Sequence, residues 1–142
     1  MVRCAGTLIS HISGVFGVGM GEMAEAIGCV VEYVRQDWQA AFSVSQVEEA
    51  VKRFKPDVVT LVHSDTPTGV LNPMVEIGQI VRSSGALFYV DFVSSGFGTK
   101  VDVSAACVDI GLLGSQKCLS LPPDLGIVTV SPAAWSQIED IK

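Results

Sequence analysis

Short runs of nearly uninterrupted apolar residues recur along this chain, and they limit its fold more than any other feature. Three of them, at 57–63, 86–91 and 108–113, include segments such as VVTLV and ALFYV. A run of this length without polar alternation is typical of a strand buried on both faces, as in a parallel sheet covered by helices. We therefore predict an α/β fold with a mainly parallel sheet and helices on both faces.

Further strands and one helix are predicted on either side of these runs. Cys29–Val34 and Gly126–Ser131 are β-rich segments, and Thr7–Ile12 is the one further strand that the first 28 residues provide. A helix is predicted at Val18–Ile27. Because so uniformly apolar a sheet needs neighbours on both sides, we expect the chain to be the central part of a larger protein.

Two more helices carry their own start and stop signals. The segment SVSQVEEAVKRFKP can begin at Ser43 or at Ser45, since both fit a capping box. The next helix is predicted to have Asn72 as its N-cap, Pro73 at its first position and Gly85 as its stop. Both helices lie between strands, as crossovers of a parallel sheet do.

Composition excludes several classes of function. The 142 residues, 49% of them apolar, are enough for one domain, and 9 basic against 15 acidic residues give a net charge of −6. Such a chain has no basic face for nucleic acid, and no uncharged apolar stretch reaches the ~20 residues of a membrane helix. The cysteines lack the spacing of a metal site, and we interpret them as buried thiols of a cytoplasmic protein: Cys4, Cys29, Cys107 and Cys118.

Three polar segments follow consecutive predicted strands: HSDTPTGVLNP at 63–73, DFVSSGFG at 91–98 and GSQKCLSLPP at 114–123. Ligands of parallel α/β sheets bind at the carboxyl ends of the strands, where these segments meet. Pyridoxal phosphate (PLP) requires a lysine for its aldehyde and an acid for its ring nitrogen, and Lys117 and Asp91 suit those roles. The alternative is that Asp91 is a turn residue and Lys117 a solvated amine.

In this order and spacing, the three segments resemble the class V aminotransferases, in particular the alanine–glyoxylate and serine–pyruvate branch. GVFGVGM at 14–20 and GIVTVSPAAW at 126–135 belong to the same resemblance, which covers most of the chain. It implies the large domain of the fold-type I PLP enzymes, with 126–131 as an antiparallel strand. It also implies a homodimer that transfers an amino group between alanine or serine and glyoxylate or pyruvate.

The resemblance assigns a role to each of five residues. Lys117 would form the internal aldimine with PLP and carry the proton during transamination, and Asp91 would pair with the pyridine nitrogen. Thr66 would bond the phenolic side of the cofactor, Gln116 would lie near its phosphate, and Val93 would press on one face of the ring.

The same resemblance sets out what the chain lacks and which alternatives remain. Residues 1–142 correspond to a partial large domain, without the phosphate-binding turn, the aromatic residue over the ring, or the C-terminal domain. A non-catalytic remnant of the family is therefore one alternative. A dinucleotide-binding module is another, because Gly19, Gly21 and Ala24 spell G-x-G-x-x-A and Asp37 follows at 18 residues from Gly19.

Overall fold

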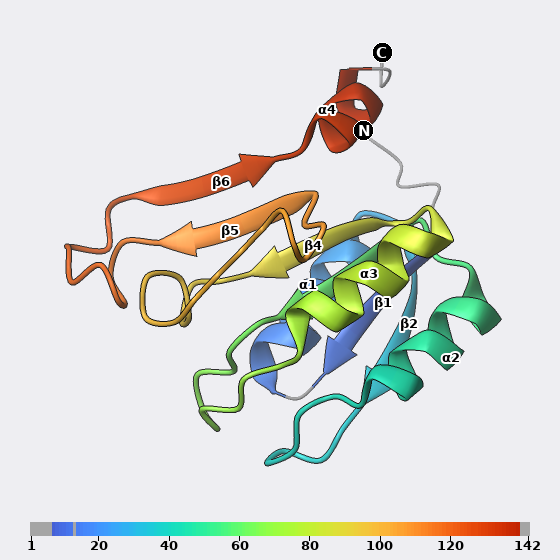
Figure 1. Cartoon of the computed structure of the whole chain (residues 1–142), viewed down its shortest axis with the longest axis horizontal. Coiled ribbons are helices and arrows are strands. Elements are labelled where there is room, and N and C mark those ends of the chain that lie inside the picture. Colours follow the sequence, from blue (N-terminus) through green and yellow to red (C-terminus); the bar gives the residue numbers. More distant parts are fainter. Residues whose placement is uncertain (1–6, 13, 140–142) are drawn as a thin grey trace.

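One six-stranded sheet organises the computed structural model, which describes residues 7–12 and 14–139 (Figure 1). The strand order is β2-β1-β3-β4-β5-β6, with every neighbouring pair parallel except β5 and β6. The predicted mainly parallel sheet with an antiparallel last strand is thus confirmed. The strands are β1 (Thr7–Ile12), β2 (Val30–Arg35), β3 (Val58–Val62), β4 (Leu87–Asp91), β5 (Ile110–Gly114) and β6 (Gly126–Val130).

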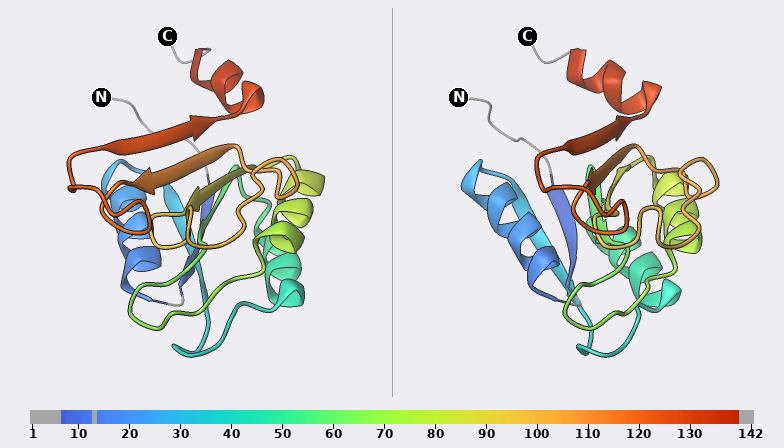
Figure 2. Two further views of the ribbon diagram at one scale, coloured as in Figure 1. Left: turned by 60° about the vertical axis from the view of Figure 1, so that its left-hand side comes forward. Right: turned by 90° about the vertical axis from the view of Figure 1, so that its left-hand side faces the viewer.

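Helices cover both faces of the sheet, as predicted. Helix α1 lies on one face, and α2 and α3 lie side by side on the other (Figure 2). Helix α4, for which the sequence analysis gave no prediction, follows β6 beyond the edge of the sheet. Their bounds are α1 (Val15–Ala26), α2 (Val44–Phe54), α3 (Met74–Ser84) and α4 (Pro132–Glu139). The main core joins α2 and α3 to β3 and β4 through the fully buried Val47, Val59, Leu61, Ile77, Val81, Phe88 and Val90.

The helix starts agree with the sequence signals in one case and not in the other. Ser43 caps α2 through the predicted capping box with Gln46. Asn72 does not cap α3, whose N-cap is the following proline. The Asn72 side chain is buried instead, where its amide donates to the Val62 carbonyl (2.8 Å) and accepts from the Phe42 N–H (3.1 Å). The Asn72 side chain thus bonds to two backbone groups of the core and does not cap the helix.

The structure rules out the dinucleotide fingerprint. Helix α1 begins at Val15, three residues earlier than predicted, so Gly19 and Gly21 lie inside the helix rather than in a strand-to-helix turn. Backbone N–H groups inside a helix already bond to its carbonyls and cannot cradle a pyrophosphate. Gly21 has a packing role, since a Cβ there would collide with the Tyr33 ring of β2.

Two other expectations need correction. Strand β5 is mostly half-buried rather than buried on both faces, because α1, α2 and α3 pack on β1 to β4. The cysteines are not four buried thiols: Cys107 is half-buried and free, Cys118 is exposed and free, and Cys29 is half-buried and disulfide-bonded. Cys4 lies outside the described residues.

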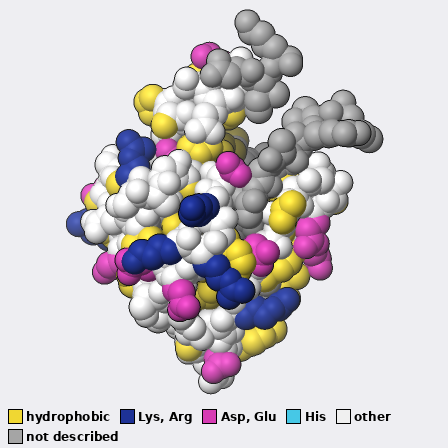
Figure 3. Space-filling view, turned by 90° about the vertical axis from the view of Figure 1, so that its right-hand side faces the viewer, with side chains coloured by type: hydrophobic (Ala, Val, Ile, Leu, Met, Phe, Trp, Pro, Cys, Tyr) yellow, Lys and Arg dark blue, Asp and Glu magenta, His cyan; other side chains and the backbone are white. Residues whose placement is uncertain are grey.

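Charged side chains of both signs are interspersed on the face shown in Figure 3, where Lys and Arg lie among Asp and Glu. None of the described helices is both long and apolar enough to cross a bilayer.

Candidate active site

A cavity of about 140 Å³ lies where the segments after β3, β4 and β5 meet. All five side chains predicted from the sequence line it, although they come from segments up to 51 positions apart: Thr66, Asp91, Val93, Gln116 and Lys117. Phe16, Val62 and Ser94 complete the wall. A larger hollow of about 550 Å³ lies between α2 and α3, but it contains none of the predicted residues. The structure therefore brings the five predicted side chains together at one cavity.

Asp91 is the last residue of β4, and its half-buried carboxylate is held in place by the chain that follows. The Val93 N–H donates to Asp91 Oδ1 at 2.7 Å. Burial raises the pKa of Asp91, while the Val93 hydrogen bond and the positive charge of Lys117 act in the opposite direction. A cation bound in the cavity would favour the charged carboxylate further.

Lys117 reaches from the segment after β5 to the segment after β3. Its Nζ donates to Thr66 Oγ1 at 3.2 Å, and Thr66 Oγ1 lies 2.5 Å from Ser94 Oγ of the third segment. The three strand ends therefore meet in one hydrogen-bonded chain of an amine and two hydroxyls.

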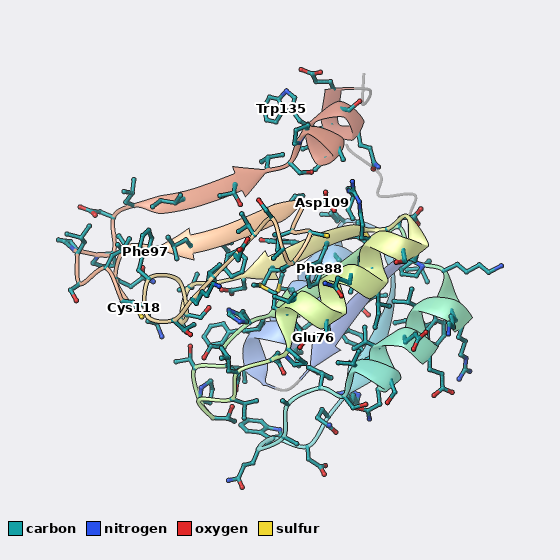
Figure 4. All side chains as sticks on the ribbon, in the orientation of Figure 1. Glu76, Phe88, Phe97, Asp109, Cys118 and Trp135 are labelled. Atoms are coloured by element: carbon teal, nitrogen blue, oxygen red, sulfur yellow. The ribbon has the colours of Figure 1, made fainter. Side chains whose placement is uncertain are left out.

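The loop that carries Lys117 is closed by Ser115, a fully buried residue. Its hydroxyl donates to the Pro122 carbonyl and accepts from the Leu125 N–H (3.3 Å), and its own N–H donates to the Leu125 carbonyl. Gln116 is exposed and lies against Gly114, where a Cβ would collide with the Gln116 amide. Figure 4 shows Cys118, the neighbour of Lys117, at the opposite end of β5 from Asp109.

Phe16, the second residue of α1, is one of three cavity residues that the sequence analysis did not predict as site residues. It lines the cavity from the opposite face of the sheet to α2 and α3. The chain thus contributes an aromatic side chain to the wall of the cavity. The signal was the GVFGVGM segment directly after a strand, but the rule that ligands bind at strand ends gave no weight to the helix that follows β1.

His63 ties the end of β3 to the loop after β4. Its N–H donates to the Asp91 carbonyl at 2.9 Å, and its buried ring lies 2.9 Å from Ser95 Oγ through Nδ1. The ring packs edge-on against Phe92, with centroids 6.0 Å apart. Burial lowers the pKa of His63, so that the neutral ring is favoured. This geometry indicates a structural role for His63.

Comparisons with known proteins identify the family to which these features belong. A sequence model of the aminotransferase class V family matches residues 17–142. An uncharacterized aminotransferase of Methanocaldococcus jannaschii is 34% identical over 98% of this chain and 36% of its own. The (S)-ureidoglycine–glyoxylate transaminase of Bacillus subtilis is 36% identical over 83% of this chain and 28% of its own.

The fold agrees with these sequence matches. The crystal structure of an alanine–glyoxylate aminotransferase from Nostoc superimposes with a TM-score of 0.93 at 29% identity, over 97% of this chain and 37% of that one. The chain thus spans about a third of the length of the proteins it matches. Sequence, topology and the arrangement of the cavity agree: the chain belongs to the class V aminotransferase family.

Proposed function

We propose that the cavity at the ends of β3, β4 and β5 is the cofactor-binding and catalytic part of a PLP-dependent aminotransferase. The observation that carries the proposal is the convergence of Lys117, Thr66 and Asp91 from three segments on one cavity. Members of the family depend on PLP, which supplies, when bound, an aldehyde for amines and a ring that withdraws electrons from the α-carbon.

The side chains in the cavity suit the ring part of that cofactor. An amine, a hydroxyl and a half-buried carboxylate are the partners for an aldehyde, a phenolic oxygen and a ring nitrogen. A raised pKa is expected for a carboxylate that is buried without a bound cationic ligand, and Asp91 has this property. Phe16 and Val93 provide apolar contact for a flat ring, and the exposed Gln116 amide is available for the phosphate.

We assign the following roles to the chain's own residues. Asp91 Oδ atoms hold a proton on the ring nitrogen. Thr66 Oγ1 bonds the phenolic oxygen. Lys117 Nζ would bind the aldehyde of the cofactor in the resting enzyme, and as a free amine it would take the proton from the substrate α-carbon.

For the substrates, we propose alanine or serine as the amino donor and glyoxylate or pyruvate as the acceptor. Two of the proteins to which the chain is similar carry glyoxylate in their names, as acceptor for different amino donors. The homodimer and the cytoplasmic location stay predictions.

The experiment that tests this proposal is reductive trapping. The chain is mixed with PLP, the visible absorption band is recorded, and borohydride reduction is followed by mass spectrometry of the peptides. We expect the label on Lys117. The variant Lys117→Ala should lose it, and Lys100→Ala, which removes an exposed lysine outside the cavity, should keep it.

Three results would count against parts of the proposal. Label spread evenly over the lysines, or unchanged labelling in Lys117→Ala, would remove Lys117 from its role. A band on Lys117 that neither alanine nor serine alters would support the non-catalytic remnant instead. Unchanged binding in Asp91→Ala would remove Asp91 as the partner of the ring nitrogen.

A further inference from the structure

Ser94 occupies a position in the cavity to which the family resemblance assigned no role. It lies three residues after Asp91, and it is half-buried in the wall beside Thr66 and Lys117. Its side chain and its backbone contact two different segments. Ser94 Oγ lies 2.5 Å from Thr66 Oγ1, and the Ser94 carbonyl accepts from the thiol of Cys118 at 3.7 Å.

Thr66 Oγ1 takes part in both hydrogen bonds of this chain. It accepts from Lys117 Nζ, and it lies 2.5 Å from Ser94 Oγ, where either hydroxyl can be the donor. In both arrangements the bond to Ser94 restricts rotation of the Thr66 hydroxyl that faces Lys117.

A second contact ties the lysine loop to the same turn. Cys118 is the residue after Lys117, and its sulfur lies against Gly98, where a Cβ would collide with it. Together with the thiol bond to the Ser94 carbonyl, this contact seats the loop after β5 on the turn after β4. Ser94 thus contacts both the hydroxyl that receives the amine and the loop that carries it.

We propose that Ser94 is a positioning residue, which fixes the Thr66 hydroxyl so that Lys117 Nζ is held in the cavity where the aldehyde of the cofactor arrives. The positioning of Thr66 by Ser94 is inferred from the contacts of the three side chains. Its effect on cofactor binding rests on the proposed function. Loss of the Ser94 hydroxyl frees the Thr66 side chain to rotate, and the Lys117 amine then has no fixed acceptor.

Two readouts on the full chain test the proposal, with Ser94→Ala as the main variant. The first is made without cofactor: three-bond NMR couplings to the Thr66 methyl carbon report its χ1 rotamer. We expect one rotamer in the wild type and rotamer averaging in Ser94→Ala. Ser94→Thr, which keeps the hydroxyl, should restore the single rotamer.

The second readout is the rate at which Lys117 is labelled by PLP and cyanoborohydride, with Lys100 of the same molecule as the internal reference. One hydrogen bond is typically worth enough to change such a rate about three- to tenfold. We expect Ser94→Ala to slow labelling of Lys117 by that factor without a change at Lys100. Ser104→Ala, at an exposed serine in the loop before β5, should leave both rates as in the wild type.

The outcomes separate this inference from the proposed function. A single Thr66 rotamer in Ser94→Ala, or Lys117 labelling as fast as in the wild type, would overturn the role of Ser94. Failure of the wild type to label Lys117 above Lys100 would count against the proposed function, and the NMR comparison would still decide whether Ser94 positions Thr66. A uniform loss of folding, seen in the whole NMR spectrum of Ser94→Ala and not rescued by Ser94→Thr, would also overturn it.

Discussion

At the scale of single residues, Asp109 shows how one buried carboxylate joins three strands. Its Oδ2 accepts from the Phe88 N–H of β4 (3.0 Å) and its Oδ1 from the Ser131 hydroxyl after β6 (2.6 Å), directly before β5 begins. Asp109→Ala leaves the buried Phe88 donor without this partner. We expect a loss of about 1–3 kcal/mol in the free energy of unfolding, measured by urea denaturation.

The matched control for Asp109 is Asp102→Ala. The Asp102 carboxylate also accepts a backbone N–H, from Ala105 at 2.9 Å, but it does so at an exposed position where water can replace it. We expect Asp102→Ala to lower the free energy of unfolding by less than about 1 kcal/mol. Equal losses in the two variants would show that Asp109 does not join the strands in the way its contacts indicate.

Asp91 leads to a prediction about pH. Burial raises its pKa above the ordinary value of 3.8, so between that value and the higher folded-state pKa the folded chain binds more protons than the unfolded chain. The free energy of unfolding contributed by this group therefore falls as the pH rises through that interval. Asp91→Asn keeps an acceptor for the Val93 N–H and does not titrate.

We expect the wild type, without cofactor, to lose stability relative to Asp91→Asn as the pH rises from 3 to 7, with a plateau once Asp91 is ionised. Urea denaturation of both proteins at each pH provides the comparison. A stability difference that stays constant over this range, or that changes in the opposite direction, would contradict the prediction.

At the scale of elements, Gly78 reverses the usual effect of a helical glycine. Replacing glycine by alanine inside a helix commonly stabilises it by up to about 1 kcal/mol. In α3, however, a Cβ at Gly78 would collide with the Ala106 carbonyl of the loop before β5. We expect Gly78→Ala to destabilise the chain by about 1–3 kcal/mol, in thermal or urea unfolding.

Gly19 in α1 offers the same substitution in open space, since nothing lies within 4 Å of a Cβ built there. Gly19→Ala should stabilise the chain by up to about 1 kcal/mol. The test is that the two substitutions change the free energy of unfolding in opposite directions. Stabilisation by Gly78→Ala would show that α3 does not pack as closely on the loop as the structure indicates.

Local signals predicted the elements well and failed where a distant contact decided the outcome. The capping box at Ser43 involves only its neighbours, and it forms as predicted. Asn72 has an equally good local pattern, yet Phe42, 30 residues away, and the core carbonyl of Val62 engage its side chain. The helix α1 likewise begins earlier than its composition indicates, and Gly21 within it is explained by the Tyr33 ring of β2, against which it packs.

At the scale of the whole molecule, the strand-end rule selected three polar segments, and the structure brings them together at one cavity. Within these segments the chemistry of the side chains singled out Lys117 and Asp91, whereas the family resemblance assigned Thr66, Gln116 and Val93. Ser94 lies in one of the same segments, but its contact with Thr66 depends on how two loops meet. Phe16 depends on where α1 crosses the sheet, which the order of residues does not give.

The outer edge of the sheet leads to the last prediction. In the described part of the chain, β6 pairs only with β5, and its Val128 is 57% exposed. Leu125, just before the strand, and Trp135 in α4 are also exposed, and an apolar hollow of about 330 Å³ lies beside Ile127. An unpaired strand edge with exposed apolar side chains is a site where chains associate.

We therefore expect the isolated 142-residue chain to associate in a concentration-dependent manner, and Val128→Lys to reduce that association by placing a charge on the β6 edge. Light scattering after size-exclusion chromatography measures it. Ile27→Lys is the control, because Ile27 is similarly exposed (59%) but lies at the end of α1 and not on β6. If both variants reduce association equally, general hydrophobicity accounts for it; if only Val128→Lys does, the association runs through the β6 edge.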